Sequence, residues 1–529
     1  MPWRRSTLLS WNTAFYASLL AILGLVFALP VFPSQDGPMH LYYVDVLRDL
    51  LTHAGRYGTY FQIRTLVSPY ATHYYLLLAF ETVFSPVMSE KLFIALYVVV
   101  FCFSFRFLVE SIGGKSSVWS LAGMPFCLHQ QVYQGFFNFC LGVSLALLLS
   151  GVWFRWHSRW NRRRVALLLG GFVLLLLTHP VPAAVYLVVI GLHFLLCVAS
   201  DAVVWSWRSC AAAIRKNGVS TALVLSSGIV AIAWVGAFMT FHPAGPPLKE
   251  VPLSLGMLLR KAHGELTFWP IAPILSWSYR AGLVMLLTAA GAFLAMAVGR
   301  HGGKLKDRAP AAVMAASAVC FVLGVVAPDH TNGSSYFSAR FPIFWILFLF
   351  ASLSAVNPSR PWKAIIGGVA LTVTLSTLWF QWQACAWIEP RLREILSAPP
   401  AAPNSAGFIL ADGVAAPGPT DLAFSPFMWT GAHYFRRSHA VILNAPWARI
   451  PIQPIKTARL EPWQDLDPFP ETEYITQVER RGQAAPTMNL VVRTGPETPS
   501  RPSEHIAFEH GLSLTWHNDV LAVYSAPHK

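Results

Sequence analysis

Charged residues are scarce in this sequence. They make up 12% of 529 residues, against 55% hydrophobic residues, and the mean hydropathy is +0.49. This scarcity excludes an ordinary water-soluble globule, because an average soluble domain carries about 25% charged residues. We therefore expect lipid to be the solvent for most of the chain.

Cysteine is also scarce, and its distribution excludes a disulfide framework in the C-terminal part of the chain. There are seven cysteines, and none lies beyond Cys385. Five of them fall in apolar stretches, namely Cys102, Cys127, Cys140, Cys197 and Cys320. Such cysteines are expected to be small, buried hydrophobic side chains. The sequence also lacks the internal repeat that marks many secondary transporters.

The net charge of +14 comes from basic residues that lie in short loops between apolar runs. The basic positions are Arg4 and Arg5, Lys115, the cluster from Arg155 to Arg164, Arg208 with Arg215 and Lys216, the run from Arg300 to Arg308, and Arg360 with Lys363. Loops on the cytoplasmic side of a membrane carry such an excess of lysine and arginine. Membrane orientation therefore explains the charge, and no nucleic acid is expected as a partner.

Eleven apolar segments are candidates for membrane-spanning helices, and several are short for a bilayer. They cover residues 9–31, 89–110, 116–129, 136–154, 165–178, 181–199, 218–240, 280–299, 309–327, 341–356 and 364–384. With these spans every basic loop falls on one side, which predicts a cytoplasmic N-terminus and an outer location for the C-terminal region. The predicted fold class is an all-α polytopic membrane domain followed by a small extracytoplasmic domain.

The apolar stretch from Tyr70 to Val87 is left out of the spans, because a crossing there would place the arginines after Phe154 on the outer side. It is predicted to be a juxtamembrane or re-entrant segment. The first external loop then covers residues 33–88. It contains a predicted amphipathic helix that can lie flat on the membrane. One face of this helix consists of Met39, Tyr42, Tyr43, Val46, Leu47, Leu50 and Leu51.

Past Trp387 the chain changes character. A membrane domain of residues 1–387 is followed by a connector, residues 388–406, and a soluble region, residues 407–529. Short β-like runs predict a small α/β or α+β domain. These runs are Phe408–Asp412, Ala440–Asn444, Asn489–Arg493 and Val520–Ser525. Candidate acceptor-binding residues on its surface are His433, Tyr434, Arg436, Arg437 and Trp447.

The first external loop begins with Ser34-Gln35-Asp36-Gly37-Pro38-Met39-His40. Asp36 follows the first span directly, and His40 lies one helical turn later. A carboxylate and an imidazole are therefore expected at the boundary of water and lipid, where ionisable residues usually face a cavity or a partner. The alternative is that Asp36 is simply the N-cap of a helix that starts with Gly37 and Pro38.

The second external loop is rich in amides, which are candidates for binding a sugar. They are Gln130, Gln131, Gln134 and Asn138, and aromatic residues that could stack on a sugar ring lie among them. The alternative is a polar turn with interfacial aromatic residues, which is a common feature of membrane proteins.

Two basic residues in external loops are candidates for binding a phosphate. Lys261 lies in the proline-rich fourth loop, whose charged residues are otherwise expected to be solvated. Arg340 ends the fifth loop at the outer mouth of a span, where the positive-inside bias disfavours arginine. Its planar, permanently charged guanidinium suits a phosphate or pyrophosphate group. The alternative is snorkelling or contact with lipid headgroups.

This arrangement resembles the GT-C glycosyltransferases, a superfamily that includes the bacterial lipid A aminoarabinose transferases and the protein O-mannosyltransferases. The resemblance covers most of the chain: an acidic motif directly after the first span (Gln35-Asp36-Gly37-Pro38), a long first external loop, a polar second loop, a later loop with a cation, and a C-terminal extracytoplasmic domain. It implies that Asp36 acts in catalysis and that Arg340 contacts the lipid-linked phosphate. His40 and the amides have no equally firm counterpart.

The sequence departs from many members of this superfamily, in which paired acids occur in the first loop. Here Gln35 precedes Asp36 and Gly37 follows it. This departure disfavours a divalent metal site without excluding one, because divalent cations require several oxygen ligands, and the sequence assigns no other cofactor. The carboxylates to test first for a metal are Asp36, Glu81 and Asp329. The imidazoles that could form a softer site are those of His40, His129, His179 and His330.

The resemblance implies a bacterial inner-membrane enzyme that transfers a sugar from a polyprenyl-phosphate donor to a periplasmic glycan, lipid or protein. Asp36 would act as general base in an inverting reaction, with His40 orienting it or transferring a second proton. Arg340, helped by Lys261, would bind the phosphate and stabilise it as it leaves.

Three other functions are weighed against this one. An O-antigen polymerase or ligase also handles polyprenyl-linked sugars through external arginines, but its important site usually lies in a large late loop. A lipid-linked sugar transporter or flippase is disfavoured by the lack of repeats and by the scarcity of charges in mid-span, where Arg106 and Glu81 are exceptions. A mere anchor for a partner-binding C-terminal domain would not need eleven spans.

Overall fold

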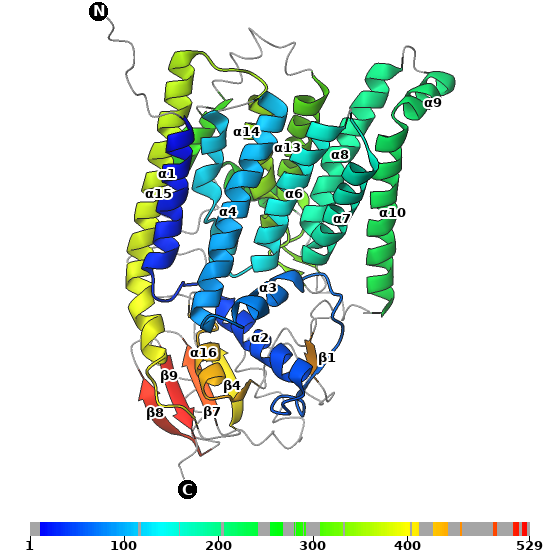
Figure 1. Ribbon diagram of the computed structural model, residues 1–529. Coiled ribbons are helices and arrows are strands. Elements are labelled where there is room, and N and C mark those ends of the chain that lie inside the picture. The colour runs from blue at the N-terminus through cyan, green and yellow to red at the C-terminus, as the bar shows by residue number, and fades with distance from the viewer. Residues whose placement is uncertain are drawn as a thin grey trace, which may run out of the picture. The chain divides into compact units, whose positions relative to one another are not determined.

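Figure 1 shows a computed structural model of the chain. The structure describes residues 11–114, 118–157, 159–202, 206–241, 254–267, 280, 282–288, 290–291, 307–331, 334–401, 405–411, 427–442, 455–457, 490–494, 511–517 and 521–525. The chain divides into two compact units, each described by itself below. Unit 1 contains Met1–Leu25, Ala95–His129 and Asn138–Phe380, and unit 2 contains Val26–Ile94, Gln130–Phe137 and Gln381–Lys529.

Unit 1 consists mainly of helices. Its described elements are α1 (Trp11–Ala28), α4 (Pro86–Gly113), η1 (Val118–Phe126), α6 (Phe137–Trp156), α7 (Arg162–Thr178), α8 (Pro180–Asp201), α9 (Trp207–Lys216), α10 (Gly218–Phe241), α11 (Leu255–Leu266), α13 (Arg308–Val326), β2 (His330–Thr331), β3 (Ser334–Ser335), η2 (Ser338–Arg340), α14 (Pro342–Leu353) and α15 (Arg360–Ile395). Parts of α1, α4, α6 and α15 belong to unit 2.

Among the described residues, seven helices are long and apolar enough to cross a membrane, namely α1, α4, α6, α8, α10, α13 and α15. Each has at least 18 residues, which at 1.5 Å per residue extends over about 27 Å or more. This length is close to the roughly 30 Å of a bilayer's hydrocarbon core. The chain is therefore a multi-pass membrane protein.

Each of these seven helices coincides with a predicted span. The predicted spans 165–178 and 341–356 are helical too, but α7 has 17 residues and α14 has 12. The predicted span 280–299 lies largely outside the described residues. The total of eleven spans stays a prediction.

The span predicted over residues 116–129 is wrong. Val118–Phe126 forms η1, a 3₁₀ helix of nine buried residues, which extends over only about 18 Å. Pro125 lies inside it and lacks the backbone N–H that an α-helix would need at that position. The ring of Phe105 also packs against Gly123 so closely that a Cβ there would overlap it. A buried, tightly packed connector therefore replaces the expected transmembrane helix.

The core of unit 1 lies where α13 packs against both α8 and α14, while α8 also contacts α7 and α10. Figure 1 shows α6, α7, α8 and α10 running alongside one another. The indole of Trp119 in η1 stacks on the ring of Phe350 in α14, with 6.1 Å between the ring centres. At the end of α4, Gly113 lies directly against the backbone of Ser354. The connector η1 and the end of α4 are thus both fixed to α14.

Unit 2 contains the first external loop and the start of the second. Its described helices and short strand in these loops are α2 (Gly37–Thr52), β1 (Phe61–Ile63), α3 (Thr72–Phe80) and α5 (Gln130–Tyr133). α3 has nine residues and is too short to cross a bilayer, which confirms that no spanning helix lies between Tyr70 and Ser85; Pro86 and Val87 begin α4.

α2 is the predicted amphipathic helix. Pro38 stands in its first turn, where a missing N–H costs nothing, and the helix ends at His53 in a left-handed conformation. Met39, Tyr42 and Val46 are fully buried, so the apolar face packs within the protein instead of lying on the membrane as expected. Burial of this helix places its N-terminal residues in the interior of unit 2.

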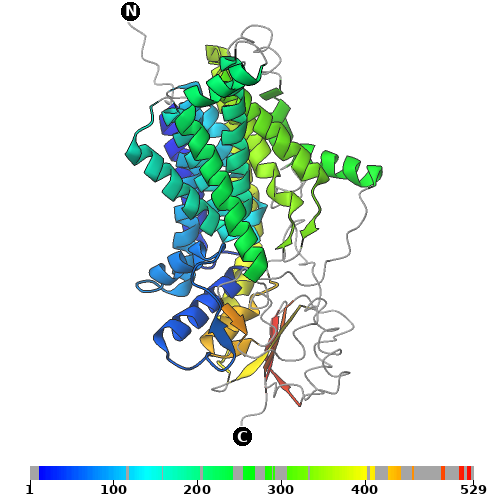
Figure 2. The ribbon, with the colours of Figure 1, turned by 90° about the vertical axis from the view of Figure 1, so that its right-hand side faces the viewer.

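The C-terminal part of unit 2 contains a five-stranded sheet with strand order β5-β4-β7-β9-β8. The described elements are β4 (Ala406–Ala411), α16 (Gly431–Arg437), β5 (Val441–Ile442), β6 (Ile455–Thr457), β7 (Leu490–Thr494), β8 (Ser513–His517) and β9 (Leu521–Ser525). β4 is parallel to β5 and β7, and β9 is antiparallel to β7 and β8. Figure 2 shows the yellow and red strands side by side.

Strands occur at the four places predicted from the sequence, and β6 and β8 were not predicted. Residues 388–395 of the predicted connector belong instead to α15. The domain boundaries and the outer location of this region stay predictions.

We expect Gly113→Ala to destabilise unit 1, because a Cβ at this position overlaps the carbonyl oxygen of Ser354. Overpacking of this kind costs about 1–3 kcal/mol, so the midpoint of thermal unfolding in detergent should fall. Gly24→Ala is the matched control, since Gly24 also lies in a helix and a Cβ there meets nothing within 4 Å. Equal midpoints for the two variants would contradict the close packing of α4 on the segment after α14.

Candidate active site

Asp36 lies at the start of α2, where the first external loop meets the second. The backbone N–H of Gln35 donates to the carbonyl of Tyr133 at 2.7 Å, and that of Asp36 donates to the carbonyl of Gln134 at 3.3 Å. These bonds join the segment after α1 to α5 and the turn that follows it. The second loop therefore covers Asp36, which is only 8% exposed.

The carboxyl group of Asp36 does not cap α2. The residue has φ −95° and ψ −10°, and its side chain accepts no capping hydrogen bond. Gln35 Nε2 donates to Asp36 Oδ1 at 3.3 Å. Burial raises the pKa of Asp36 to about 7, and the bond from Gln35 opposes this shift only in part. The capping alternative is wrong for the side chain, and the carboxyl group can exchange a proton near neutral pH.

Gly135 is the residue that permits this close approach of the two loops. Its φ is +81°, which side chains rarely adopt. A Cβ at Gly135 would lie 2.8 Å from the Cβ of Asp36 and 3.0 Å from its backbone nitrogen. Only glycine therefore fits between the two loops.

His40 holds the same turn through its side chain. Its Nε2 lies 2.8 Å from the carbonyl oxygen of Gly135, and because a carbonyl only accepts, Nε2 carries the proton. Its Nδ1 then accepts, from His73 Nε2 at 3.0 Å and the Tyr74 hydroxyl at 3.3 Å. Burial lowers the pKa of His40 to about 3. These contacts favour a neutral, structural imidazole that supports the second loop over a group that transfers protons.

The glutamines of the second loop are buried beside Asp36. Gln130, Gln131 and Gln134 are each less than a tenth exposed. Gln134 contributes its backbone carbonyl to Asp36, a role that an amide-rich pattern in the sequence does not reveal. Asn138, at the start of α6, accepts from the N–H of Phe139 at 2.9 Å. Their predicted role in binding a sugar stays a prediction.

Two further charged residues, missed in the sequence, lie near the start of α4. Glu90 is fully buried, accepts a hydrogen bond from the hydroxyl of Ser34, and abuts Gly37, the residue after Asp36. Lys91 is 5% exposed, and its Nζ lies 3.3 Å from the carbonyl oxygen of Phe27. The sequence signal that could have revealed them is a pair of adjacent opposite charges at the start of an apolar run, because burying a charge there costs free energy.

Arg340 is buried in unit 1 at the end of η2, with 7% of its surface exposed. Its Nη1 lies 2.9 Å from Nε2 of His179, and its guanidinium carbon lies 5.9 Å from the ring centre of Phe139. Burial, and then the charge of Arg340, holds the pKa of His179 well below its usual range. This burial argues against snorkelling, and the neutral imidazole and the ring fix the guanidinium plane.

Lys261 has a carboxylate partner. Its Nζ lies 2.9 Å from Asp329 Oδ1 and donates to the carbonyl of Ala327 at 2.8 Å. The hydroxyl of Ser338, two residues before Arg340, also donates to Asp329. The structure thus connects Lys261 to the element that carries Arg340, although Asp329 neutralises the lysine.

Glu265 lies one helical turn after Lys261 in α11 and is 2% exposed. Trp345 Nε1 donates to its Oε2 at 2.8 Å. Burial raises the pKa of Glu265 to about 8, although the Trp345 bond opposes the shift. A neutral acid is therefore expected at this position near pH 7.

The described residues contain no group of three or more His, Cys, Asp or Glu that could hold a metal ion. Of the carboxylates singled out as metal ligands, Asp329 is paired with Lys261, and Glu81 is paired with Arg48 at 2.6 Å and Arg436 at 3.3 Å. Both carboxylates already have cationic partners.

Two solved structures share the fold of this chain. ArnT from Cupriavidus metallidurans bound to undecaprenyl phosphate has a TM-score of 0.53 and 11% identity, over 99% of this chain and 100% of that chain. Arabinofuranosyltransferase AftD from Mycobacteria has a TM-score of 0.52 and 15% identity, over 98% of this chain and 40% of that chain. The chain therefore shares its fold with these two proteins, in agreement with the resemblance predicted from the sequence. No family model and no curated protein matches the sequence of this chain.

We expect Gly135→Ala to force the second external loop away from Asp36. Both the left-handed φ and the crowding against Asp36 Cβ oppose a side chain here, so the thermal midpoint should fall. Gly55→Ala separates the two causes, because Gly55 has φ +85° but a Cβ there meets nothing within 4 Å. The fall in the thermal midpoint should be clearly larger for Gly135→Ala than for Gly55→Ala. Similar losses would mean that contact with Asp36 does not constrain this loop.

Proposed function

We propose that the protein is a glycosyltransferase that transfers a sugar from a polyprenyl-phosphate donor to an extracytoplasmic acceptor. The observation that carries this proposal is Asp36, a buried carboxyl group with a pKa of about 7 that lies between the first helix and α2 in a fold shared with ArnT and AftD. Two solved structures with this fold support it, since one is an arabinofuranosyltransferase and the other holds undecaprenyl phosphate.

Asp36 takes the proton of an acceptor hydroxyl as general base. The hydroxyl oxygen forms a bond to the anomeric carbon of the sugar, and the bond between that carbon and the phosphate oxygen breaks. Polyprenyl phosphate leaves with the electron pair of the broken bond, and the anomeric configuration inverts. A base whose pKa lies near the working pH is well suited to this step, because it is substantially ionised and still basic.

Arg340 binds the phosphate of the donor and stabilises the negative charge that develops as it leaves. A guanidinium suits this role because it stays charged and presents its N–H groups in one plane. His179 and Phe139 hold that plane in place. Lys261 is the weaker phosphate ligand of the two, because Asp329 already neutralises its charge.

Gln130, Gln131, Gln134 and Asn138 are the candidates for hydrogen bonds to sugar hydroxyls, and His40 supports the loop that carries three of them. We place the enzyme in the bacterial inner membrane, with a cytoplasmic N-terminus and the C-terminal sheet in the periplasm. The acceptor is an envelope glycan, a lipid or a protein.

The decisive experiment measures transfer of labelled sugar from a panel of polyprenyl-phosphate donors by the purified protein in lipid. We expect wild type to transfer sugar, Asp36→Asn to lose about 10²-fold or more in kcat, and Arg340→Ala to lose about 10²-fold in kcat/KM for the donor. Asparagine keeps the size and an oxygen of the aspartate side chain while removing the base.

Arg308→Ala is the matched control for Arg340→Ala, because Arg308 pairs with Asp201 at 2.9 Å and has no proposed part in transfer. Each variant should elute as a monodisperse species before its activity is compared. Full activity of Asp36→Asn would show that Asp36 is not the general base. Uptake or flipping of a lipid-linked sugar without any glycosyl transfer would favour a transporter.

The pH profile tests the state of Asp36. As general base, Asp36 must be ionised, so kcat should rise with pH and level off above about pH 7. Burial raises the folded pKa above the ordinary value of 3.8, so this group's contribution to stability is fully present below pH 3.8 and is lost as pH rises to about 7. The thermal stability of wild type relative to Asp36→Asn should therefore fall over this window. A relative stability independent of pH would contradict the raised pKa.

A further inference from the structure

Helix α16 of the C-terminal region is short and held at its end by exposed Arg437, which donates to the carbonyl oxygens of Leu396 and Ala398. His433 and Tyr434, expected on the surface, are buried instead. Burial lowers the pKa of His433 to about 3, so this face of α16 carries a neutral imidazole. Trp447, another residue expected on that surface, lies outside the described residues.

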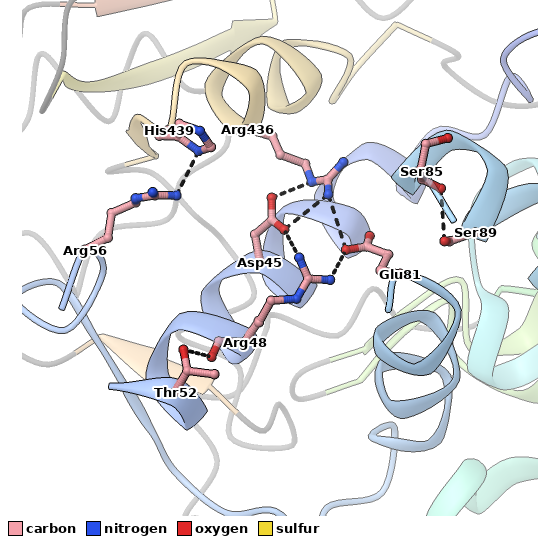
Figure 3. A network of polar contacts seen from close by, with 9 residues as sticks. All are labelled: Asp45, Arg48, Thr52, Arg56, Glu81, Ser85, Ser89, Arg436 and His439. Atoms are coloured by element: carbon pink, nitrogen blue, oxygen red, sulfur yellow. Dashed lines mark hydrogen bonds and ion pairs between the residues drawn. The ribbon is translucent and has the colours of Figure 1, made fainter. Parts of the chain in front are cut away.

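Arg436 points from α16 toward α2 and the end of α3, as Figure 3 shows. Its Nε lies 2.6 Å from Asp45 Oδ2, and its Nη2 lies 3.1 Å from Asp45 Oδ1, so the contact with this carboxylate is bidentate. Its Nη2 also lies 3.3 Å from Glu81 Oε2. Arg48 contacts the same two acids, with Nη1 3.3 Å from Asp45 and Nη2 2.6 Å from Glu81.

The four side chains form a cluster without net charge, in which two arginines face two carboxylates. The side chains of Arg436 and Asp45 are 14% and 16% exposed, and that of Glu81 is 1% exposed. Ion pairs with this degree of burial are screened by water far less than surface pairs, and removal of one partner leaves an uncompensated charge. Without Arg436, the ion pairs of Asp45 and Glu81 within the described part of the chain would be those with Arg48, whose side chain is 39% exposed.

Further contacts join the C-terminal region to the first external loop. The N–H of Ile442 in β5 donates to the hydroxyl of Tyr42 in α2 at 3.0 Å in a buried bond. β6 pairs antiparallel with β1, with Gln62 opposite Lys456. The C-terminal region thus contacts α2 at Tyr42 and at Asp45, in addition to the bonds at the first turn of the helix.

Helix α2 connects this cluster to the candidate base. Asp45 follows Asp36 by nine residues, which is about 14 Å along an α-helix. The first turn is fixed by the bond from His40 to Gly135, and the third turn by Arg436. A helix fixed at two places cannot tilt or rotate freely, so both contacts determine where Asp36 is held.

We propose that Arg436 is a positioning residue, which docks α16 onto α2 and thereby holds Asp36 in place for transfer. The C-terminal region is then an integral part of the active site instead of a separate acceptor-binding module. This inference rests on the proposed function, and it extends that function to a residue about 400 positions away in the sequence.

The test compares wild type with Arg436→Met, Arg436→Lys and Arg393→Met in two measurements. The first is hydrogen exchange of the amides in Gly37–Thr52, and the second is the kcat and donor KM of sugar transfer. Arg436→Met should speed exchange in Gly37–Thr52 severalfold and lower kcat by about tenfold or more, with little change in donor KM, because misplacing a reacting group by about 1 Å costs up to about 10²-fold.

Arg436→Lys should recover part of the loss, because lysine restores the charge but not the bidentate geometry. Arg393→Met removes an arginine of α15 that lies in the same unit and pairs with Glu389 at 3.5 Å, and it should leave α2 exchange and kcat unchanged. Exchange in Arg308–Val326 of α13 should stay at its wild-type rate in all variants, which separates a local effect from general unfolding.

Unchanged exchange in Gly37–Thr52 of Arg436→Met would overturn the docking role whatever the activity. Faster exchange with unchanged kcat would overturn the positioning role. If wild type transfers no sugar from any donor in the panel, the proposed function fails, and the positioning of a catalytic base fails with it. In that case the exchange data still show whether Arg436 fixes α2.

Discussion

The two backbone hydrogen bonds that Gln35 and Asp36 donate to the second external loop are the constraint on which the candidate site depends. N–H groups at the start of a helix have no partner within the helix, and burial makes an outside partner necessary. The carbonyls of the second loop supply it and bring Gly135 against Asp36. The resulting burial shifts the pKa of the carboxyl group to about 7, so its proposed chemistry follows from main-chain contacts.

Burial affects the other ionisable groups according to the partner that each one has. A carboxylate beside Lys261 cancels its charge locally, whereas the imidazole beside Arg340 stays neutral and does not cancel the charge of the guanidinium. Glu265 accepts from an indole N–H, which favours the carboxylate, but the larger effect of burial raises its pKa to about 8. Arg340 is therefore the better suited of the two cations to hold an anion.

Within unit 2, helix α2 connects the candidate base to the residue that Arg436 contacts. Its first turn carries Asp36 and His40, and its third turn carries Asp45. The apolar residues between them are buried, which explains why a helix with a membrane-surface pattern packs within the protein instead. A rigid helix transmits a displacement at one end to the other. The ion pairs between α16 and Asp45 and the contacts between Asp36 and the second loop therefore both determine the position of α2.

The sequence by itself determined most of the architecture. Long apolar runs predicted the seven helices of the described part of the chain that can cross a membrane, because the cost of burying charge in lipid leaves a signal that spans about twenty residues. Alternating β-like runs predicted four strands, and the position of Asp36 after the first span marked it as a candidate. The residues from 118 to 126 were mispredicted, because a short apolar run does not distinguish an α-helix from a buried 3₁₀ helix.

Only the tertiary structure decided which polar groups meet. The contact of Glu90 with Ser34, the bond from His40 to Gly135 and the docking of Arg436 on Asp45 join residues separated by 56, 95 and 391 positions. Such pairs leave no periodic pattern, because each residue only has to match a partner that the fold brings near. The same is true of the pKa of Asp36, since burial is a property of everything packed around a group.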